Sequence, residues 1–313
     1  MLNFSNTVCK LALVSVMSLA VHAMRGQGFV EISGEVGIEH LHSATAYMGG
    51  GCAWLDFNND GWEDLYVTGG LISDRLYRNN GDGSFSDVTA GSGLEFTELA
   101  NTMGVCTGDV DRDGNEDIFV ITWRSTTNSQ LAPSMLFINQ GNGLFFEQAE
   151  EMGITEAAYS VGGSMIDVNG DGWLDLYSGN YVATPGFLYE DGAVVGFDHE
   201  CYEDWIYINN QDGTFTEMAA ELNATNDGCT LAVAGTNYDR DEDVDLMIIN
   251  DFGQWVLPNQ LFEYQNGGDT LINISAQTAV DVGLYGMGVA VGDYDEDLDL
   301  DYYVTNLGRN VLL

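Results

Sequence analysis

Short runs of apolar residues alternate with polar turns along most of the chain. The runs are rich in aromatic and β-branched residues, and the turns are rich in Asn, Asp and Gly. The run that begins at Leu76, for example, is joined to Phe85 by the turn Asn79-Asn-Gly-Asp-Gly83, which is typical of a β-hairpin. The 39 glycines and only 3 prolines also favour many short strands and exclude a long helical bundle. We therefore predict an all-β protein.

An Asp-rich segment recurs five times and sets the internal period of the chain. Its copies begin at positions 56, 109, 167, 237 and 293, so they are 53, 58, 70 and 56 residues apart. A hairpin pattern alternates with it, at Leu76–Phe85, Leu136–Phe145, Ile206–Phe215 and, more weakly, from Leu261. Each unit thus holds about four strands, two around the Asp-rich loop and two around the Asn-Gly turn. Four-stranded antiparallel units at this period are the blades of a β-propeller.

The two ends of the repeat array predict how the ring closes. Phe29 to Ile38 repeats the pattern of Phe85 to Leu94, which ends a unit, before any Asp-rich segment has occurred. We expect this N-terminal strand to complete the last blade, because closure of the ring hides two sheet edges. Residues 286–313 supply the first strands of a fifth blade.

The spacing of oxygen-bearing residues in the Asp-rich loops predicts metal binding. In a tight turn, side chains at loop positions 1, 3, 5 and 9 can converge on one point, and position 7 can add its backbone carbonyl. Such a cage of hard oxygen atoms selects Ca²⁺ over zinc or copper. Carboxylates this close repel one another unless a cation neutralises them. We predict about one Ca²⁺ per loop, up to five in all, with these ligand residues: Asp56, Asn58, Asp60, Trp62, Asp64, Asp109, Asp111, Asp113, Asn115, Asp117, Asp167, Asn169, Asp171, Trp173, Asp175, Asn237, Asp239, Asp241, Asp243, Asp245, Asp293, Asp295, Asp297, Asp299 and Asp301.

The fourth and fifth loops depart from the pattern of the first three. Glu242 and Leu298 replace the glycine at position 6, which turns through positive φ without steric cost. Asn237 replaces the first aspartate, so a turn without metal is the alternative for these two loops. An EF-hand is excluded for all five, because it needs a Glu at position 12 and flanking helices. Position 12 is instead held by Val67, Val120, Ser178, Ile248 and Val304.

These residues resemble the FG-GAP/VCBS repeats of integrin-α-like β-propellers. The match is closer to the secreted group related to cartilage acidic protein, whose chains carry an ASPIC/UnbV domain after the propeller. The segment from Gly286 to Asn310 is especially similar to that group, and the likeness spans residues 29–313. The resemblance implies calcium sites at the blade hairpins and a seven-bladed propeller, of which five units are visible. Because no ASPIC/UnbV domain follows, we expect residues 24–313 to be a propeller truncated at its C-terminus.

The N-terminal residues and the net charge restrict location and partners. Residues 1–23 read as a secretory signal, because Lys10 precedes the apolar run Leu11–Val21 and a small-residue cleavage site ends at Ala23. A buried N-terminal helix is the alternative. We expect a secreted protein, in the periplasm or at the cell surface if the host is bacterial, and no membrane-spanning helix. The formal charge of −41 excludes binding to nucleic acid and to anionic lipid.

Secretion would allow disulfide bonds among the four remaining cysteines. A bond between Cys52 and Cys106 would join neighbouring units, and one between Cys201 and Cys229 would fasten a local insertion. Buried free thiols are the alternative.

The sequence contains no recognisable catalytic constellation, so we expect a non-enzyme. His40 and His42 would lie on one face of a strand, where a metal or acid/base role is conceivable but packing is commoner. The best candidate for a specific site is the insertion Asn180–Asp204 of the third unit, and a loop with Trp123 and Arg124 could contribute. The aromatic and charged residues in and beside the insertion are Tyr181, Phe187, Tyr189, Phe197, His199, Glu200, Tyr202 and Trp205.

We therefore expect a calcium-binding adhesion or recognition propeller for an extracellular protein or glycan. The alternative for the insertion is that its aromatic residues only cover a blade edge. An extracellular polysaccharide-active enzyme on the same scaffold and a purely structural module of a longer protein are the alternative functions.

Overall fold

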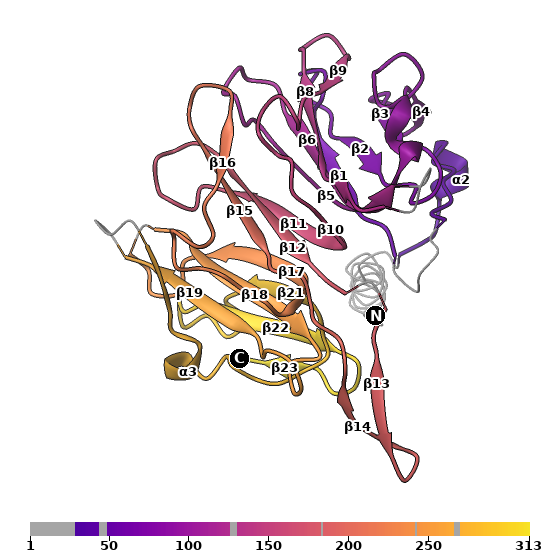
Figure 1. Cartoon of the computed structure of the whole chain (residues 1–313). Coiled ribbons are helices and arrows are strands. Elements are labelled where there is room, and N and C mark those ends of the chain that lie inside the picture. Colours follow the sequence, from indigo (N-terminus) through magenta and orange to yellow (C-terminus); the bar gives the residue numbers. More distant parts are fainter. Residues whose placement is uncertain (1–28, 44–48, 126–129, 183, 242, 266–269) are drawn as a thin grey trace, which may run out of the picture.

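The computed structural model describes residues 29–43, 49–125, 130–182, 184–241, 243–265 and 270–313. The secretory signal expected at residues 1–23 lies outside these ranges. β-Strands dominate and form a succession of small antiparallel sheets (Figure 1). Within the described ranges, no helix is long and apolar enough to cross a membrane.

The first three blades each contain four antiparallel strands in the order in which they occur along the chain. Blade 1 consists of β1 (Cys52–Leu55), β2 (Asp64–Val67), β3 (Arg75–Asn79) and β4 (Phe85–Asp87). Blade 2 consists of β5 (Ala100–Gly108), β6 (Asp117–Ser125), β8 (Met135–Asn139) and β9 (Phe145–Glu147). Blade 3 consists of β11 (Ser160–Ile166), β12 (Asp175–Asn180), β15 (Trp205–Asn209) and β16 (Phe215–Glu217).

The fourth and fifth blades continue the same pattern. Blade 4 consists of β17 (Cys229–Thr236), β18 (Asp245–Asp251), β19 (Gln260–Tyr264) and β20 (Leu271–Asn273). Blade 5 contains β21 (Gly286–Gly292), β22 (Asp301–Asn306) and β23 (Val311–Leu312). The prediction of two strands around each Asp-rich loop and two around each Asn-Gly turn is therefore confirmed.

Smaller elements lie outside the blade sheets. Two of them are two-stranded sheets. One consists of β7 (Ala132–Pro133) and β10 (Ala157–Ala158), and the other of β13 (Phe187–Glu190) and β14 (Ala193–Phe197). The described helices are short: α2 (Ser33–Val36), the 3₁₀ helix η1 (Glu95–Leu99) and α3 (Ser275–Thr278).

Successive blades pack through their innermost strands and share apolar cores. β1 contacts β5, β5 contacts β11, β11 contacts β17 and β17 contacts β21. One apolar cluster, for example, joins Leu55 and Tyr66 of blade 1 to Ile118 and Phe137 of blade 2, and all four side chains are buried. Because a single blade buries only part of its apolar surface, each blade depends on its neighbours. This arrangement is that of a β-propeller, as predicted.

Each unit also reaches over to the next blade through the turn that follows its outer strand. The Phe145 amide of β9 donates to the Ser92 carbonyl at 2.7 Å, and the Phe215 amide of β16 donates to the Met152 carbonyl at 2.7 Å. Gly93 and Gly153 in these turns have positive φ, and a Cβ on either would clash with the Phe145 or Phe215 carbonyl. Only glycine therefore fits this close approach.

The expected role of the N-terminal segment was wrong. Residues 29–38 do not complete blade 5 but lie against blade 1, where the carbonyl of Phe85 approaches Gly37 as Phe145 approaches Gly93. The hydroxyl of Tyr77 donates to the Glu39 carbonyl at 2.6 Å and helps to hold the segment there. Residues 29–38 therefore resemble, in sequence and in position, the turn that ends a unit and packs against the following blade. The physical reason is that the glycine of such a turn contacts the blade after it, which for this segment is blade 1.

The pairing of Cys52 with Cys106 was also wrong, whereas that of Cys201 with Cys229 is confirmed. Cys52 precedes its Asp-rich loop by four residues and Cys106 precedes its own by three. Because side chains alternate between the two faces of a strand, this offset turns the two thiols to different sides. Cys52 is exposed, and Cys106 packs against the core between blades 2 and 3.

The contact between inner strands predicts that Gly162 tolerates no side chain. A Cβ at Gly162 would lie 2.6 Å from the Leu231 carbonyl oxygen of blade 4. We expect Gly162→Ala to lower the free energy of unfolding by about 1–3 kcal/mol, since backbone atoms cannot move aside cheaply. The measurement is the midpoint of chemical denaturation. Gly288→Ala is the matched control on an inner strand, because its Cβ would meet only the Thr305 side chain at 3.4 Å. Equal effects of the two substitutions would contradict this account.

Candidate metal centres and recognition surface

All five Asp-rich loops have the same internal hydrogen bonds. In the first loop the Asp60 amide donates to Asp56 Oδ1 at 3.0 Å and to Asn58 Oδ1 at 2.9 Å. The amide at position 5 makes the corresponding bond to position 1 in the other four loops, at 3.0–3.1 Å. The position 7 amide donates to the position 5 carboxylate in each loop, at 2.8–2.9 Å. The chain therefore turns around one point in each blade.

The fifth loop keeps this shape although it lacks the glycine. Leu298 has a φ of +77°, close to the +84° to +90° of Gly61, Gly114 and Gly172. Its amide donates to Asp293 Oδ2 at 3.0 Å, as the Gly61 amide does to Asp56 Oδ2 at 2.8 Å. A leucine in this region of φ is strained. Glu242 of the fourth loop lies outside the described residues.

Three carboxylates converge in each of two loops, at positions 1, 3 and 9 in the second loop and at positions 1, 3 and 5 in the fifth. Carboxylate oxygens of Asp109, Asp111 and Asp117 lie within 4.8 Å of one another in the second loop. Those of Asp293, Asp295 and Asp297 do so in the fifth loop. Three negative charges at this spacing destabilise the metal-free loop.

The aspartate at position 9 is buried and held in place by backbone amides. Asp117 begins β6, and its carboxylate accepts hydrogen bonds from the Val110 amide at 3.0 Å and from the Asn139 amide at 2.8 Å. Asp175 accepts the corresponding bonds from Val168 and Asn209. Burial, reinforced by the other loop carboxylates, raises the pKa of Asp117 and of Asp175 to about 7.

The donor set fits a hard divalent cation. It consists of carboxylate and amide oxygens, with no nitrogen or sulfur ligand, which is the chemistry that calcium prefers. Among the described residues, no donor reaches the buried Asp64 Oδ2, whereas Asp64 Oδ1 accepts a hydrogen bond from the Asn79 amide at 2.7 Å. Burial raises the pKa of Asp64 and of Asp245 to about 6. A cation at the loop centre would relieve this cost in the first four blades, where the aspartate at position 9 is buried.

Neighbouring loops are linked through a buried asparagine that sequence reasoning missed. The Asn139 side chain donates from Nδ2 to the Phe57 carbonyl in the first loop at 2.8 Å, while its amide binds Asp117 in the second. Asn209 repeats this arrangement one blade later, on the Val110 carbonyl at 2.8 Å and on Asp175. The recurring Asn of the Asn-Gly turn was the available signal. It was interpreted only as a turn residue.

A second set of contacts joins position 4 of one loop to position 7 of the next. Asn59 Nδ2 donates to Asn115 Oδ1 at 2.8 Å, and the Arg112 guanidinium carbon lies 4.7 Å from the centre of the Trp173 ring. Arg240 forms an ion pair with Asp299. The side chains at position 7 therefore connect the loops, whereas their predicted role as carbonyl ligands stays a prediction.

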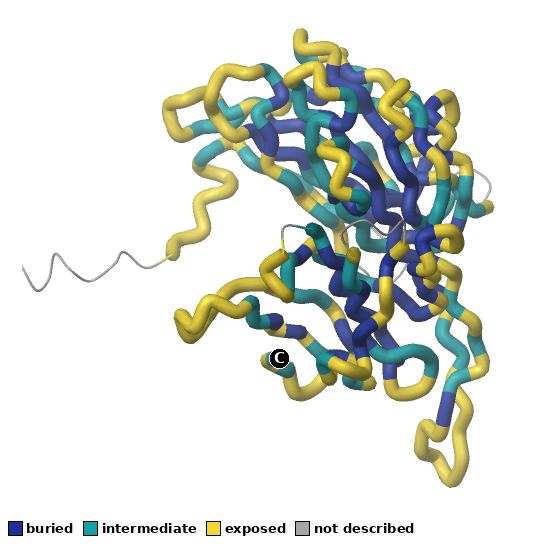
Figure 2. The backbone as a smooth tube through the Cα atoms, turned by 90° about the vertical axis from the view of Figure 1, so that its left-hand side faces the viewer, coloured by how far each residue is buried: buried dark blue, intermediate teal, exposed yellow. Residues whose placement is uncertain are grey.

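The insertion of the third unit forms an arm at the opposite end of the blade from the loops. β12 begins at Asp175 of the third loop and ends at Asn180, where the insertion starts, so the two features occupy opposite ends of one strand. The hairpin of β13 and β14 projects away from the blades (Figures 1 and 2). Phe187, Leu188 and Tyr189 on β13 are exposed. This part of the predicted site is therefore accessible.

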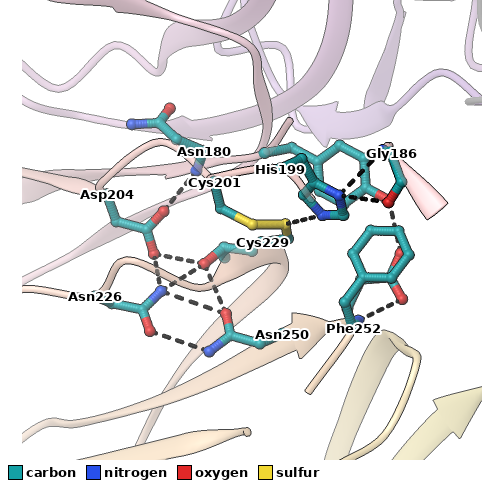
Figure 3. The surroundings of a disulfide bond; sticks show 12 residues. Asn180, Gly186, His199, Cys201, Asp204, Asn226, Cys229, Asn250 and Phe252 are labelled. Carbon is teal, nitrogen blue, oxygen red and sulfur yellow. Dashed lines mark hydrogen bonds between the residues drawn. A yellow bond between two sulfur atoms is a disulfide. The ribbon is translucent and has the colours of Figure 1, made fainter. Parts of the chain in front are cut away.

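The base of the insertion is fixed by a disulfide and a buried carboxylate (Figure 3). Asp204 accepts hydrogen bonds from the Asn180 amide at 2.6 Å, Tyr177 at 2.7 Å, Asn226 at 2.7 Å and Thr230 at 2.6 Å. Asn180 and Tyr177 belong to blade 3, Thr230 belongs to blade 4, and Asn226 lies in the connection between these two blades. Burial raises the pKa of Asp204 to about 7 against the opposing effect of these donors.

Not every aromatic residue of the predicted site is at the surface. Tyr181 and Trp123 are buried in one apolar cluster, and Trp205 packs against the core between blades 2 and 3. The expected surface contribution of Trp123 was therefore wrong, because its ring packs edge-on against Tyr159 at 5.2 Å and also contacts Tyr181. His199, Glu200 and Tyr202 follow the hairpin. Glu200 and Tyr202 are exposed and His199 is half-buried.

Blade 4 adds two rings that sequence reasoning missed, the buried Phe252 and the exposed Trp255. Phe252 lies 4.5 Å from Phe197, and Trp255 lies 6.0 Å from Phe197, between ring centres. Both come from the turn after β18, which occupies the same place in blade 4 as the insertion does in blade 3. That equivalence in the repeat could have indicated them.

The two N-terminal histidines pack on blade 1. His40 donates from Nε2 to the Thr68 carbonyl at 2.8 Å, and His42 donates from Nδ1 to the same oxygen at 3.0 Å. They thereby attach the N-terminal segment beside β2.

Comparisons with known proteins agree with the repeat architecture. The FG-GAP-like repeat family matches residues 56–120, from the first loop to the second. Cartilage acidic protein 1 of Mus musculus is 24% identical over 279 residues, which cover 84% of this chain and 39% of that protein. Cartilage acidic protein 1 of Homo sapiens is 29% identical over 158 residues, covering 49% of this chain and 23% of that protein. The chain thus spans well under half the length of these relatives.

Among solved structures, the chain is similar to BBS1N in a crystal structure of its complex with ARL6DN, soaked with lead. The TM-score is 0.40 at 11% sequence identity, covering 87% of this chain and 71% of that chain.

The raised pKa values predict that the metal-free protein loses stability as pH rises. The carboxyls of Asp117 and Asp175 have a pKa of about 7 in the folded chain, against an ordinary value of 3.8. The folded state therefore binds more protons than the unfolded state between about pH 4 and pH 7. In excess chelator we expect the free energy of unfolding to fall on the order of 2–4 kcal/mol across this interval. Denaturant titrations at several pH values would measure it, and stability that rises over the interval would contradict it.

The strained fifth loop predicts that a glycine there is stabilising. Leu298 is exposed at a φ of +77°, so Leu298→Gly removes backbone strain and little packing. We expect a gain of about 1 kcal/mol in the free energy of unfolding, measured by denaturation. The reciprocal change, Gly114→Leu in the second loop, is the matched control and should cost a similar amount, because a Cβ at Gly114 would meet no atom within 4 Å. A loss of stability in Leu298→Gly would show that the strain argument is wrong.

Proposed function

We propose that this FG-GAP repeat protein is a calcium-stabilised β-propeller that recognises an extracellular protein or glycan. The observation that carries the proposal is the repetition of one oxygen-lined loop in all five blades, each closed by the same hydrogen bonds. A rigid row of such loops at one end of the blades leaves the other end for binding.

Calcium supports this function through the free energy of folding. The bound ion would supply positive charge and coordination to the loop carboxylates. The residues that would hold it are those at positions 1, 3, 5 and 9, with Asp117 and Asp175 already oriented by backbone amides. Since Asn139 and Asn209 connect successive loops, order in one loop favours order in the next.

An extracellular location is supported by three independent features. The chain is similar to cartilage acidic protein 1, it contains the disulfide Cys201–Cys229, and its first 23 residues have the pattern of a secretory signal. Disulfides persist in oxidising compartments, where free calcium is also plentiful enough to fill weak sites.

Thermal unfolding of the chain from Met24, with calcium and with excess chelator, tests the metal half of the proposal. Binding to the folded state alone raises stability by about 3–4 kcal/mol per site at a hundred to a thousand times Kd. We expect a large rise in Tm with Ca²⁺ and little with Mg²⁺. Asp171→Asn should reduce the rise by the share of one loop.

Asp212→Asn is the matched control, because Asp212 is an exposed acid on the hairpin of the same blade, outside the loops. A Tm that does not respond to calcium would refute calcium stabilisation. The recognition half is tested by probing the calcium-loaded protein on arrays of glycans and secreted proteins. A purely structural module would respond to calcium but would show no saturable ligand.

A further inference from the structure

Five aromatic rings form a continuous row of contacts from the exposed tip of the insertion to the buried Phe252 and the exposed Trp255 of blade 4. We call Tyr189, Phe187, Phe197, Phe252 and Trp255 the aromatic stripe. Neighbouring ring centres along it are 6.5, 5.1 and 4.5 Å apart, and Trp255 lies 6.0 Å from Phe197. The exposed fractions of Tyr189, Phe187 and Trp255 are 66%, 44% and 40%. Three of the rings are thus accessible to solvent, and Phe197 connects Trp255 to the two on the hairpin.

The stripe is anchored at its blade end and free at its tip. Trp255 donates from Nε1 to the Tyr285 hydroxyl at 3.2 Å, and His199 packs edge-on against Phe252 with ring centres 5.0 Å apart. The Cys201–Cys229 bond fastens the base. The hairpin of β13 and β14 pairs with no other strand among the described residues, and an isolated two-stranded hairpin is marginally stable in water. A ligand along the hairpin would therefore stabilise it.

The insertion that carries most of the stripe is acidic and contains no lysine or arginine. From residue 125 to residue 239 the sequence contains no lysine and no arginine. Glu190, Asp191, Asp198 and Glu200, which belong to the insertion, are all exposed. The net charge of −41 opposes a second copy of the chain as the occupant. The acidic surroundings favour a cationic partner.

Exposed aromatic faces and carboxylates together define the chemistry of that partner. Ring faces attract ammonium and guanidinium groups, most strongly on Trp and Tyr, and neighbouring carboxylates add ion pairs. An extended peptide can also pair with the free edge of a hairpin through its backbone. Neutral glycans would use the rings but not the charge.

Building on the recognition function proposed above, we infer that the aromatic stripe binds an extended segment of another protein that is rich in Lys and Arg. Its cationic side chains lie over Tyr189 and Trp255, and Glu190 and Asp191 pair with them at the tip. The apolar residues of the segment cover Phe187.

Fluorescence anisotropy with a labelled peptide of alternating Arg and Val tests this assignment on the calcium-loaded chain. A peptide of alternating Gln and Val is the neutral probe. We expect saturable binding of the Arg-Val peptide that weakens with salt, and much weaker binding of the Gln-Val peptide. The double variant Tyr189→Ser with Trp255→Ser keeps every charge and should weaken Arg-Val binding about tenfold or more.

Phe96→Ser is the matched control. Phe96 is exposed on η1 between Glu95 and Glu98, so it is also a ring in acidic surroundings, and its loss should leave Arg-Val binding unchanged. Calcium-dependent melting checks that each variant is folded. Should Trp255→Ser fail to fold, Tyr189→Ser alone, at the solvent-exposed tip, is expected to weaken binding several-fold.

Unchanged binding in the folded aromatic variants would overturn the inference, because it would show attraction by diffuse charge alone. Binding of neutral glycans or of the Gln-Val peptide in place of the Arg-Val peptide, lost in the variants, would also overturn it but would leave the recognition function standing. Self-association lost in the variants, measured by sedimentation, would assign the stripe to a second copy. Absence of calcium-dependent melting would instead refute calcium stabilisation, whichever peptide binds.

Discussion

The buried aspartate at position 9 of the first four Asp-rich loops is the interaction on which the architecture depends. Asp117 lies at the start of β6, where it closes the second loop through Val110 and fixes the following hairpin through Asn139. The side chain of Asn139 then reaches the first loop at Phe57. One carboxylate thus joins a loop, a hairpin and, through one asparagine, the neighbouring blade. The cost is the burial of an acid, which raises its pKa to about 7.

Because of this constraint, the two ends of the blades differ in how much their sequences can vary. At the loop end, similar residues recur in every blade, and contacts join the first loop to the second, the second to the third and the fourth to the fifth. At the other end, the connections between the second and third strands of a blade vary in length and composition, as the insertion before β15 and the short turn after β18 show. Binding surfaces can change there without disturbing the loops. The exposed rings of the aromatic stripe lie at this end.

The repeat pattern in the sequence specified most of the fold and the shape of the loops. Period-two strands and Asn-Gly turns predict four strands per unit because these signals are local. The placement of residues 29–38 could not be read in the same way, since Gly37 is determined by a carbonyl of another unit. The free thiols of Cys52 and Cys106, in contrast, could have been predicted, because their different offsets from the loop place them on different faces of their strands. Trp123 was misplaced because an aromatic residue in a connecting segment can be either buried or exposed.

The contacts between loops explain why the degenerate fifth loop keeps its shape. A leucine at a φ of +77° and an excess of carboxylates both oppose this turn in isolation. Arg240 of the fourth loop pairs with Asp299, so the neighbouring blade supplies a positive charge where the loop has none of its own. In the second loop, Arg112 instead contacts the Trp173 ring of the third. Two of the few cations in this acidic chain thus stand at position 4 of a loop, where each one stabilises the loop of the next blade. The loops therefore depend on one another for charge as well as for geometry, and their shape is a property of the array of blades.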